Sequence, residues 1–419
     1  MMRKSLLLGV IDQAVLSLFN MAVSFALIAY ATPMEFGRYV YALTVILILT
    51  SLHNALISTP LSVLIPARTG ALRMRTVDDL VSFDLLLRMA GVVVALAFFI
   101  IAHRDPSFIL AGLAGAYLTL GRERARSLFI ATDRVERCLV LDLVFAVSAV
   151  AFTVILWGTL APSTATLSAI ALANALALLL TTLGETRPVN PITGGAAVAQ
   201  TYWREHWRDT RWSLAGASVT EAHNRAYVVV LEVLRDAAAV ASVQAGRLLL
   251  GPLVLLASAW VRIVRPAFAG LLARDERDAA WRLLWQGLSL VSLLAFAYAM
   301  ALVLAWPLAE TYVFKGRYAD IAVVTALWGI YTGLALARIM LSTVLQAAYR
   351  LRALAYASMA AAMVSALLLL ALLLEVPAWA AIIAVIAGEA VLLMWIGILV
   401  AKLFRDPQPL SARARGTAE

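Results

Sequence analysis

The sequence has little charge and almost no cysteine. Only 14% of its residues are charged, while 63% are hydrophobic. A soluble domain could not cover so much apolar surface, so this composition indicates a protein whose apolar runs lie in a lipid bilayer. The single cysteine, Cys138, excludes a disulfide framework within the chain and a metal cluster built on cysteines.

Several catalytic signatures are also missing. The sequence has no G-x-x-x-x-G-K-[ST] loop, so we do not expect ATP hydrolysis by this chain. It has no H-E-x-x-H motif and no His/Cys cluster, so we expect no metal and no cofactor. The net charge of +9 comes mostly from arginines in the connectors. We therefore interpret it as the charge that orients the chain in the membrane, and we expect no nucleic-acid partner.

Twelve apolar runs are long enough to cross a bilayer, which takes roughly 20 residues of helix. They cover about 10–31, 38–66, 81–102, 107–131, 138–160, 164–184, 210–234, 237–268, 282–309, 319–346, 353–374 and 378–403. The sequence therefore predicts an all-α integral membrane protein with twelve transmembrane helices. The connectors predicted to lie outside are short, which disfavours an enzyme with an outer catalytic domain.

The distribution of lysine and arginine predicts the orientation of these helices. Most of the 34 basic residues fall in the two tails and in every second connector, counted from the amino terminus. The positive-inside rule then places both termini in the cytoplasm of a bacterial inner membrane. The first apolar run continues well beyond the length of a signal peptide, so we interpret it as a transmembrane helix.

The two halves of the sequence echo each other. Pro66 and Pro266 occupy matching places in the second and eighth runs, and Phe36-Gly37 and Asp236-Ala237 precede them at the same offset. Because each half has six runs, the repeats would share one orientation. This predicts two six-helix bundles related by a pseudo-twofold axis along the membrane normal.

We expect four parts along the chain: an N-terminal lobe at 1–184, a cytoplasmic linker at 185–209, a C-terminal lobe at 210–404 and a disordered tail at 405–419. The linker begins with prolines and glycines and ends with Tyr202-Trp203-Arg204-Glu205-His206-Trp207-Arg208. Tryptophans among basic residues suit a short helix at the level of the lipid headgroups. A plain linker with aromatic anchors is the alternative.

Two arginines fall near the middle of their predicted helices. Arg225 lies in the seventh run and Arg247 in the eighth. A buried charge needs a partner or a wet cavity, and paired guanidinium groups could clamp a pyrophosphate. The alternatives are an ion pair between Arg225 and Glu221, four residues earlier, and packing of Arg247 against carbonyl groups.

Other polar groups also interrupt the apolar runs. Arg122 and Arg126 share one face of the fourth run and Arg338 holds the repeat-related place in the tenth, so these three could attract an anionic headgroup or simply snorkel to the surface. Arg88 lies four residues from Asp84, which predicts a structural ion pair.

The remaining polar groups are His53, Asn54, Glu221, His223 and Glu389. Histidine and carboxylate groups could titrate during a transport cycle, or they could be satisfied by hydrogen bonds from neighbouring helices. Prolines in the second and eighth runs predict helices that bend: Pro60, Pro66, Pro252 and Pro266.

Several short motifs resemble one family. These are Asp12-Gln13 with Asn20, Glu35-Phe36-Gly37-Arg38-Tyr39, Ile57-Ser58-Thr59-Pro60, Asn224-Arg225 and Val313-Phe314-Lys315-Gly316-Arg317-Tyr318-Ala319. They resemble Wzx-type polysaccharide flippases of the multidrug/oligosaccharidyl-lipid/polysaccharide exporter superfamily. The resemblance implies a MATE-like pair of six-helix bundles around a central cavity. Asn224 stands where relatives often carry aspartate, which puts a transferred ion site there in doubt.

We therefore expect a flippase for undecaprenyl-pyrophosphate-linked oligosaccharide, acting in exopolysaccharide or O-antigen synthesis, with a polymerase and a chain-length regulator as further partners. The expected substrate-binding residues are Arg225, Arg247, Arg122, Arg126, Arg338, His53, Asn54 and Asn224. The candidates for the coupling ion are Glu221, His223 and Glu389. A MATE-type drug or cation antiporter is the first alternative and a membrane polysaccharide polymerase the second.

Overall fold

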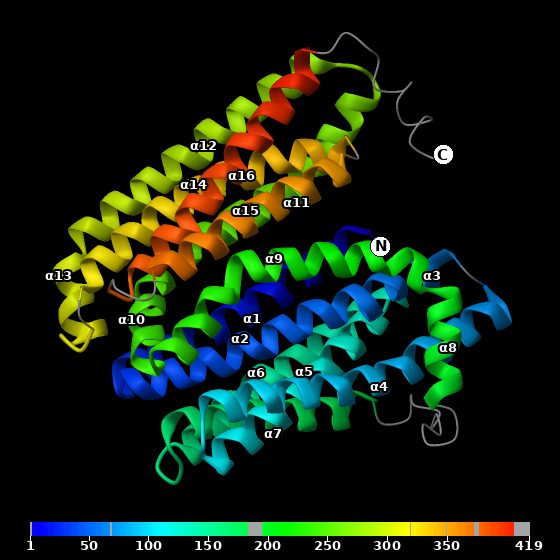
Figure 1. Cartoon of the computed structure of the whole chain (residues 1–419). Helices are drawn as coiled ribbons and strands as arrows, with labels where there is room; N and C mark the ends of the chain where they lie inside the picture. Colours follow the sequence, from blue (N-terminus) through cyan, green and yellow to red (C-terminus); the bar gives the residue numbers. More distant parts are fainter. Residues whose placement is uncertain are drawn as a thin grey trace. The chain divides into compact units, whose positions relative to one another are not determined.

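The computed structural model describes residues 2–67, 69–182, 195–318, 320–348, 350–372 and 377–405. Within these ranges every regular element is a helix, as Figure 1 shows. The all-α fold predicted from the sequence is therefore confirmed. The first part of the predicted linker (185–194) and nearly all of the predicted tail (406–419) lie outside the described residues.

The helices of the first half follow the predicted runs closely. They are α1 (Met2–Tyr30), α2 (Pro33–His53), the π-helix η1 (Asn54–Ser58), α3 (Thr59–Ala67), α4 (Gly70–Ala102), α5 (Pro106–Ala131), α6 (Val135–Leu156) and α7 (Pro162–Thr182). The predicted second span is thus one apolar run built from α2, η1 and α3.

The linker and the second half add the remaining helices. They are α8 (Gly195–Glu205), α9 (Trp207–Leu234), α10 (Ala237–Leu248), α11 (Gly251–Ala273), α12 (Arg277–Leu304), α13 (Trp306–Leu308), the π-helix η2 (Ala309–Phe314), α14 (Ile321–Ala347), α15 (Leu351–Leu372) and α16 (Ala380–Arg405). The predicted eighth span is the broken pair of α10 and α11.

Each of the twelve predicted spans coincides with a helix or a broken helix. Among the residues that the structure describes, 9 helices are long and apolar enough to cross a membrane, or up to 10 if the bent pair α10–α11 is one span. The two others, α5 and α9, contain no stretch that is both long and apolar enough. In α5 the charged segment Arg122–Arg126 interrupts the apolar run.

Contacts divide the chain into two compact units. Unit 1 contains residues 1–221 and 228–240, and unit 2 contains residues 222–227 and 241–419. Helix α9 contributes to both units, so its sequence position alone does not assign it to a lobe. The lobe boundaries expected from the sequence therefore stay a prediction.

Packing within each unit involves helices that lie far apart in the sequence. In unit 1, α1 packs on α6, α5 packs on α7 and on α4, and the linker helix α8 packs on α4 (Figure 1). In unit 2, α14 contacts α11, α12, α15 and α16. Helix α14 is therefore the central helix of unit 2, and it carries several of the polar groups considered below.

Two helices begin with a capping side chain followed by a proline. Thr32 and Asp105 each cap a helix whose first residue is proline, where a missing N–H costs nothing. Asp105 Oδ1 accepts hydrogen bonds from Ser107 N at 2.9 Å and Ser107 Oγ at 2.7 Å. The side-chain bond from Ser107 lowers the pKa of the Asp105 carboxyl, because it stabilises the charged form.

Two spans depart from a regular α-helix beside a proline. Helix α2 passes through the π-helix η1 into α3 as one continuous span, with Pro60 at the second position of α3, and α10 meets α11 at a bend of 54° beside Pro252. Pro66 and Pro266 lie within α3 and α11, where the helix continues through them. Of the four prolines expected to bend spans, Pro252 therefore lies at a bend, and Pro60 lies directly after the π-helix.

The starts of α2 and α10 approach each other closely within unit 1. A Cβ atom added to Gly37 would lie 1.7 Å from the backbone oxygen of Ala237. These are two of the residues that echo each other in the sequence. Glycine is required at position 37 because any side chain there would collide with backbone, which cannot move aside as a side chain could.

We predict that Gly37→Ala destabilises the protein by about 1–3 kcal/mol, the usual cost of overpacking. Thermal unfolding in detergent, followed by fluorescence, would measure the effect. Gly115→Ala in α5 is the matched control, because its Cβ would meet Ile46 Cδ1 at 3.5 Å, an ordinary contact. Equal melting temperatures for both variants would contradict the close approach.

Candidate functional site

An arginine framed by three aromatic rings occupies unit 2. Arg247 comes from the last turn of α10, Tyr227 from α9, and Trp328 and Tyr331 from α14. The guanidinium carbon lies 4.8 Å from the ring centroid of Trp328 and 5.9 Å from that of Tyr331. Trp328 and Tyr331 are three residues apart, so they share one face of their helix. We call these four residues the arginine–aromatic cluster.

Hydrogen bonds hold this cluster in place. The Tyr227 hydroxyl accepts from Arg247 Nη1 at 3.0 Å and from Gln244 Nε2 at 2.7 Å. Trp328 Nε1 donates to the Val243 carbonyl at 2.7 Å, which fixes the ring against α10. The side chains that surround the guanidinium are therefore ordered before any ligand binds.

Asn224 joins the same cluster. Its Oδ1 accepts a hydrogen bond from the Tyr331 hydroxyl at 3.2 Å. The structure thus brings together Arg247 and Asn224, two of the residues expected to bind substrate. An asparagine at this position contributes a dipole without a negative charge, so it leaves the positive charge of Arg247 in place.

No carboxylate forms an ion pair with Arg247 among the residues that the structure describes. Its contacts are a hydroxyl oxygen and the faces of aromatic rings, which stabilise a cation without cancelling its charge. The alternative expected from the sequence, packing against carbonyl groups, is replaced by contacts with side chains. Such a guanidinium can form strong bidentate hydrogen bonds with a phosphate.

Arg225 and Glu221 lie one turn apart on α9, and both are half-buried. Their helical spacing is the one that favours an ion pair. A clamp formed jointly by Arg225 and Arg247 stays a prediction.

A buried network in unit 2 connects three other expected site residues. Glu389 of α16 accepts from Arg338 Nε through Oε1, and its Oε2 lies 3.1 Å from His223 Nε2. Ser365 Oγ lies 3.2 Å from His223 Nδ1 on the opposite side of the ring. A neutral imidazole with its proton on Nε2 would donate to Glu389 and accept from Ser365. Arg338 therefore neutralises Glu389, and His223 connects that carboxylate to Ser365.

In unit 1, two guanidinium groups meet three carboxylates. Arg126 contacts Asp142 at 2.6 Å, Asp12 at 2.9 Å and Glu123 at 3.1 Å. Arg122 contacts Asp142 at 2.5 Å, and its guanidinium carbon lies 3.9 Å from the Phe145 ring centroid. With all five groups ionised, this network carries a formal charge of −1.

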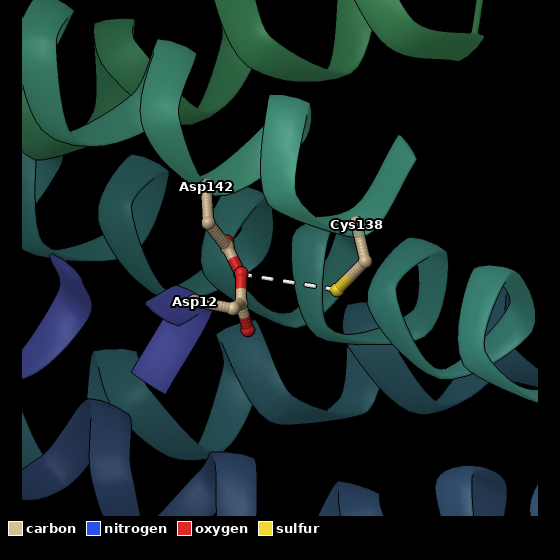
Figure 2. Close-up of side chains that lie close together, drawn as sticks. All are labelled: Asp12, Cys138 and Asp142. Atoms are coloured by element: carbon tan, nitrogen blue, oxygen red, sulfur yellow. Dashed lines mark hydrogen bonds between the residues drawn. The ribbon is translucent and has the colours of Figure 1, made fainter. Parts of the chain in front are cut away.

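The same network contains one arrangement with the composition of a metal site. Figure 2 shows Asp12, Cys138 and Asp142 converging, and one ligand atom from each lies within 4.8 Å of the others. Cys138 Sγ is 4.0 Å from Asp142 Oδ2. Arg126 already contacts both carboxylates, so a metal ion would have to displace its guanidinium group. The positive charge of Arg126 already occupies this place, which disfavours a bound metal ion here.

A second network in unit 1 is centred on Asp84. The carboxylate lies 2.6 Å from His53 Nε2, 3.0 Å from Arg88 Nε and 3.5 Å from Arg124 Nε. The predicted pair of Arg88 and Asp84 is confirmed. His53 directs Nε2 to this carboxylate, while Asn54 accepts a hydrogen bond from Ser58 at 2.7 Å. His53 Nε2 is satisfied by this contact, whereas its Nδ1 is buried without a hydrogen-bond partner among the described residues.

Sequence reasoning missed several participants in these networks. Asp142 interrupts an apolar run and could have been noticed for that reason, because a carboxylate there needs a partner. Tyr227, Trp328 and Tyr331 carried no such signal, since aromatic residues at helical spacing usually form core. Their role depends on which helices meet, and no pattern within one helix records that.

We predict that Asp84→Asn lowers the stability of the protein by about 3–5 kcal/mol, because it leaves buried guanidinium groups without their counter-charge. Yield of folded protein and thermal unfolding in detergent would measure this. Asp275→Asn is the matched control, since Asp275 is exposed and its pair with Arg277 contributes little. A variant of Asp84 as stable as the control would contradict the structural role of the network.

No protein-family model matches the chain, and no curated protein matches it either. Solved structures share its fold. The lipid II flippase MurJ in an inward closed conformation has a TM-score of 0.72 and 10% identity, over 94% of this chain and 87% of that chain.

Two transporters of the MATE family are also similar. An inward-facing multidrug resistance MATE transporter of the MOP superfamily has a TM-score of 0.63 and 12% identity, over 94% of this chain and 96% of that chain. The eukaryotic MATE transporter AtDTX14 has a TM-score of 0.59 and 13% identity, over 99% of this chain and 98% of that chain. The structures to which this chain is similar are therefore transporters and flippases with the MATE/MurJ-like fold, and the chain shares that fold.

Proposed function

We propose that this protein is a flippase that moves undecaprenyl-pyrophosphate-linked oligosaccharide across the bacterial inner membrane by alternating access. The arginine–aromatic cluster carries the proposal. Arg247 holds a positive charge that no carboxylate cancels among the described residues, and the surrounding rings keep it ordered. A pyrophosphate supplies the missing negative charge, and the planar guanidinium group matches its oxygen atoms.

The broken helix supports a moving site. Arg247 ends α10 directly before the bend of 54° that separates it from α11. A change in this bend would reorient Arg247 relative to α11 without unfolding either helix. Discontinuous helices beside the substrate site are a common feature of secondary transporters. This arrangement links binding of the lipid headgroup to the shape of the helix that holds it.

Energy for the cycle would come from an ion gradient or from the membrane potential. Moving one elementary charge across the membrane is worth about 2.3 kcal/mol per 100 mV. His223 is the candidate for coupling because it contacts Glu389 beside Arg338, and histidine is the side chain whose ordinary charge change lies between pH 5 and 8. Glu221 remains a further candidate on the same helix.

The runner-up is a MATE-type exporter of drugs or cations, which the shared fold favours. A cationic substrate needs a carboxylate whose charge is available. Four of the buried carboxylates, those of Asp12, Asp84, Asp142 and Glu389, contact arginine side chains. The buried Glu232 carboxylate of unit 1 lies 3.3 Å from His103 Nε2. The available charge in unit 2 is that of an arginine, and this favours an anionic substrate.

We predict that Arg247→Ala lowers polysaccharide export by about tenfold to a hundredfold, the effect of losing a charge-assisted hydrogen bond of about 1.5–3 kcal/mol. Arg247→Lys should restore only part of the activity, because lysine keeps the charge but loses the planar donor pair. Export in a deletion strain and the leaflet in which lipid-linked repeat units accumulate would be measured.

The matched control is Arg274→Ala, which removes an exposed arginine of the same unit. Membrane insertion should be normal for all three variants. Full export by Arg247→Ala would contradict the proposal. Normal polysaccharide together with altered resistance to cationic dyes would identify the runner-up function instead.

We predict that His223→Gln flattens the pH dependence of export, because glutamine can donate to Glu389 but cannot add a proton. Export by energised membrane vesicles would be measured at several pH values. Glu389→Gln should cost more activity than His223→Gln, since it also leaves the Arg338 charge uncompensated. An unchanged pH profile for His223→Gln would remove this residue from the coupling mechanism.

A further inference from the structure

Pro60 leaves a buried carbonyl group of the second span without its usual donor. In an α-helix the carbonyl of Leu56 would accept a hydrogen bond from the residue four positions later, which is Pro60, and proline has no N–H. The Thr59 N–H, one position before Pro60, bonds to the Asn54 carbonyl instead. Leu56 is buried, so a carbonyl left unsatisfied there would be costly.

A tyrosine of the linker helix supplies the missing donor. The Tyr202 hydroxyl on α8 donates to the Leu56 carbonyl oxygen at 2.7 Å, across 146 positions of sequence. The Tyr202 ring stacks on Phe83 of α4 with centroids 3.7 Å apart, and only 2% of Tyr202 is exposed. Burial raises the pKa of the Tyr202 hydroxyl to about 12, so it keeps the proton that this bond requires.

We infer that Tyr202 is a positioning residue, whose hydroxyl stabilises the π-helical form of α2–η1–α3 and so lets the linker helix α8 control the shape of that span. The inference rests on the proposed transport cycle for its functional consequence, but the bond itself can be tested without substrate. Lifting α8 from α4 would withdraw the donor and would favour a different geometry at Pro60.

The bend between α10 and α11 in unit 2 shows the same kind of hydrogen bond. The Leu253 N–H bonds to the Leu250 carbonyl, three residues earlier as in a 3₁₀-helix, so it does not bond to the carbonyl of Leu249. The Tyr298 hydroxyl of α12 donates to that Leu249 carbonyl at 2.5 Å. A tyrosine from another helix thus satisfies a freed carbonyl beside the π-helix in unit 1 and at the bend in unit 2, which argues against an accidental contact at Tyr202.

The experiment uses the full chain in lipid nanodiscs, without substrate, and measures amide hydrogen exchange over residues 54–66. Tyr202→Phe removes only the hydroxyl and keeps the ring on Phe83. Tyr39→Phe in α2 is the matched control, because the buried Tyr39 hydroxyl has no hydrogen-bond partner among the described residues. Pro60→Ala, alone and combined with Tyr202→Phe, restores an N–H that can serve Leu56.

We expect Tyr202→Phe to speed exchange over this segment by about tenfold, the factor that corresponds to about 1.4 kcal/mol. Tyr39→Phe should leave exchange unchanged. In the Pro60→Ala background the effect of Tyr202→Phe should disappear, because the restored N–H occupies the same carbonyl. Such non-additivity is the signature of two groups that share one partner.

Two results would overturn the inference: exchange unchanged in Tyr202→Phe, or an equal effect of that substitution with Pro60 and with Ala at position 60. The rate of export should fall in Tyr202→Phe, while the substrate concentration that gives half-maximal export stays unchanged. The reason is that the hydroxyl contacts the Leu56 carbonyl and does not belong to the arginine–aromatic cluster. Failure of the flippase proposal is separate, since it would show as full export by Arg247→Ala while the exchange result still stood.

Discussion

Burial of guanidinium groups among apolar helices is the constraint on which this structure depends. A charge in such surroundings must be matched by an opposite charge or by polar atoms, because the surrounding medium offers neither. Arg126, Arg122 and Arg338 meet this requirement with the carboxylates of Asp142 and Glu389. Their pairs connect one helix with another, α5 with α6 and α14 with α16, so neutralising the charges also determines which helices pack together.

Arg247 meets the same requirement differently, and the difference carries the functional argument. A hydroxyl group and aromatic faces stabilise its charge without cancelling it. The site can therefore still attract an anion, whereas the charges of the paired arginines are neutralised by carboxylates of the protein. Arg247 and Arg338 belong to one unit, but Arg338 is paired with a carboxylate and Arg247 is not. We therefore assign a binding role to Arg247 and a structural role to Arg338.

The backbone follows a parallel rule. The π-helix with Pro60 and the bend between α10 and α11 each free a carbonyl group that must find a donor, and in both places a tyrosine hydroxyl provides it. Irregular helices are thus stabilised by hydrogen bonds from outside the helix. Because such a bond can be made or withdrawn by moving another helix, the shape of these two spans depends on their neighbours.

The sequence by itself determined the all-α membrane class and the approximate helices, because hydropathy acts over neighbouring residues along the chain. It also predicted the pair of Arg88 and Asp84, which lie one helical turn apart. Only the tertiary structure decided that Arg247 lies among aromatic rings while Arg338 meets Glu389. The reason is that the partner of a buried charge comes from another helix, and the pattern within one helix does not specify which helix that is.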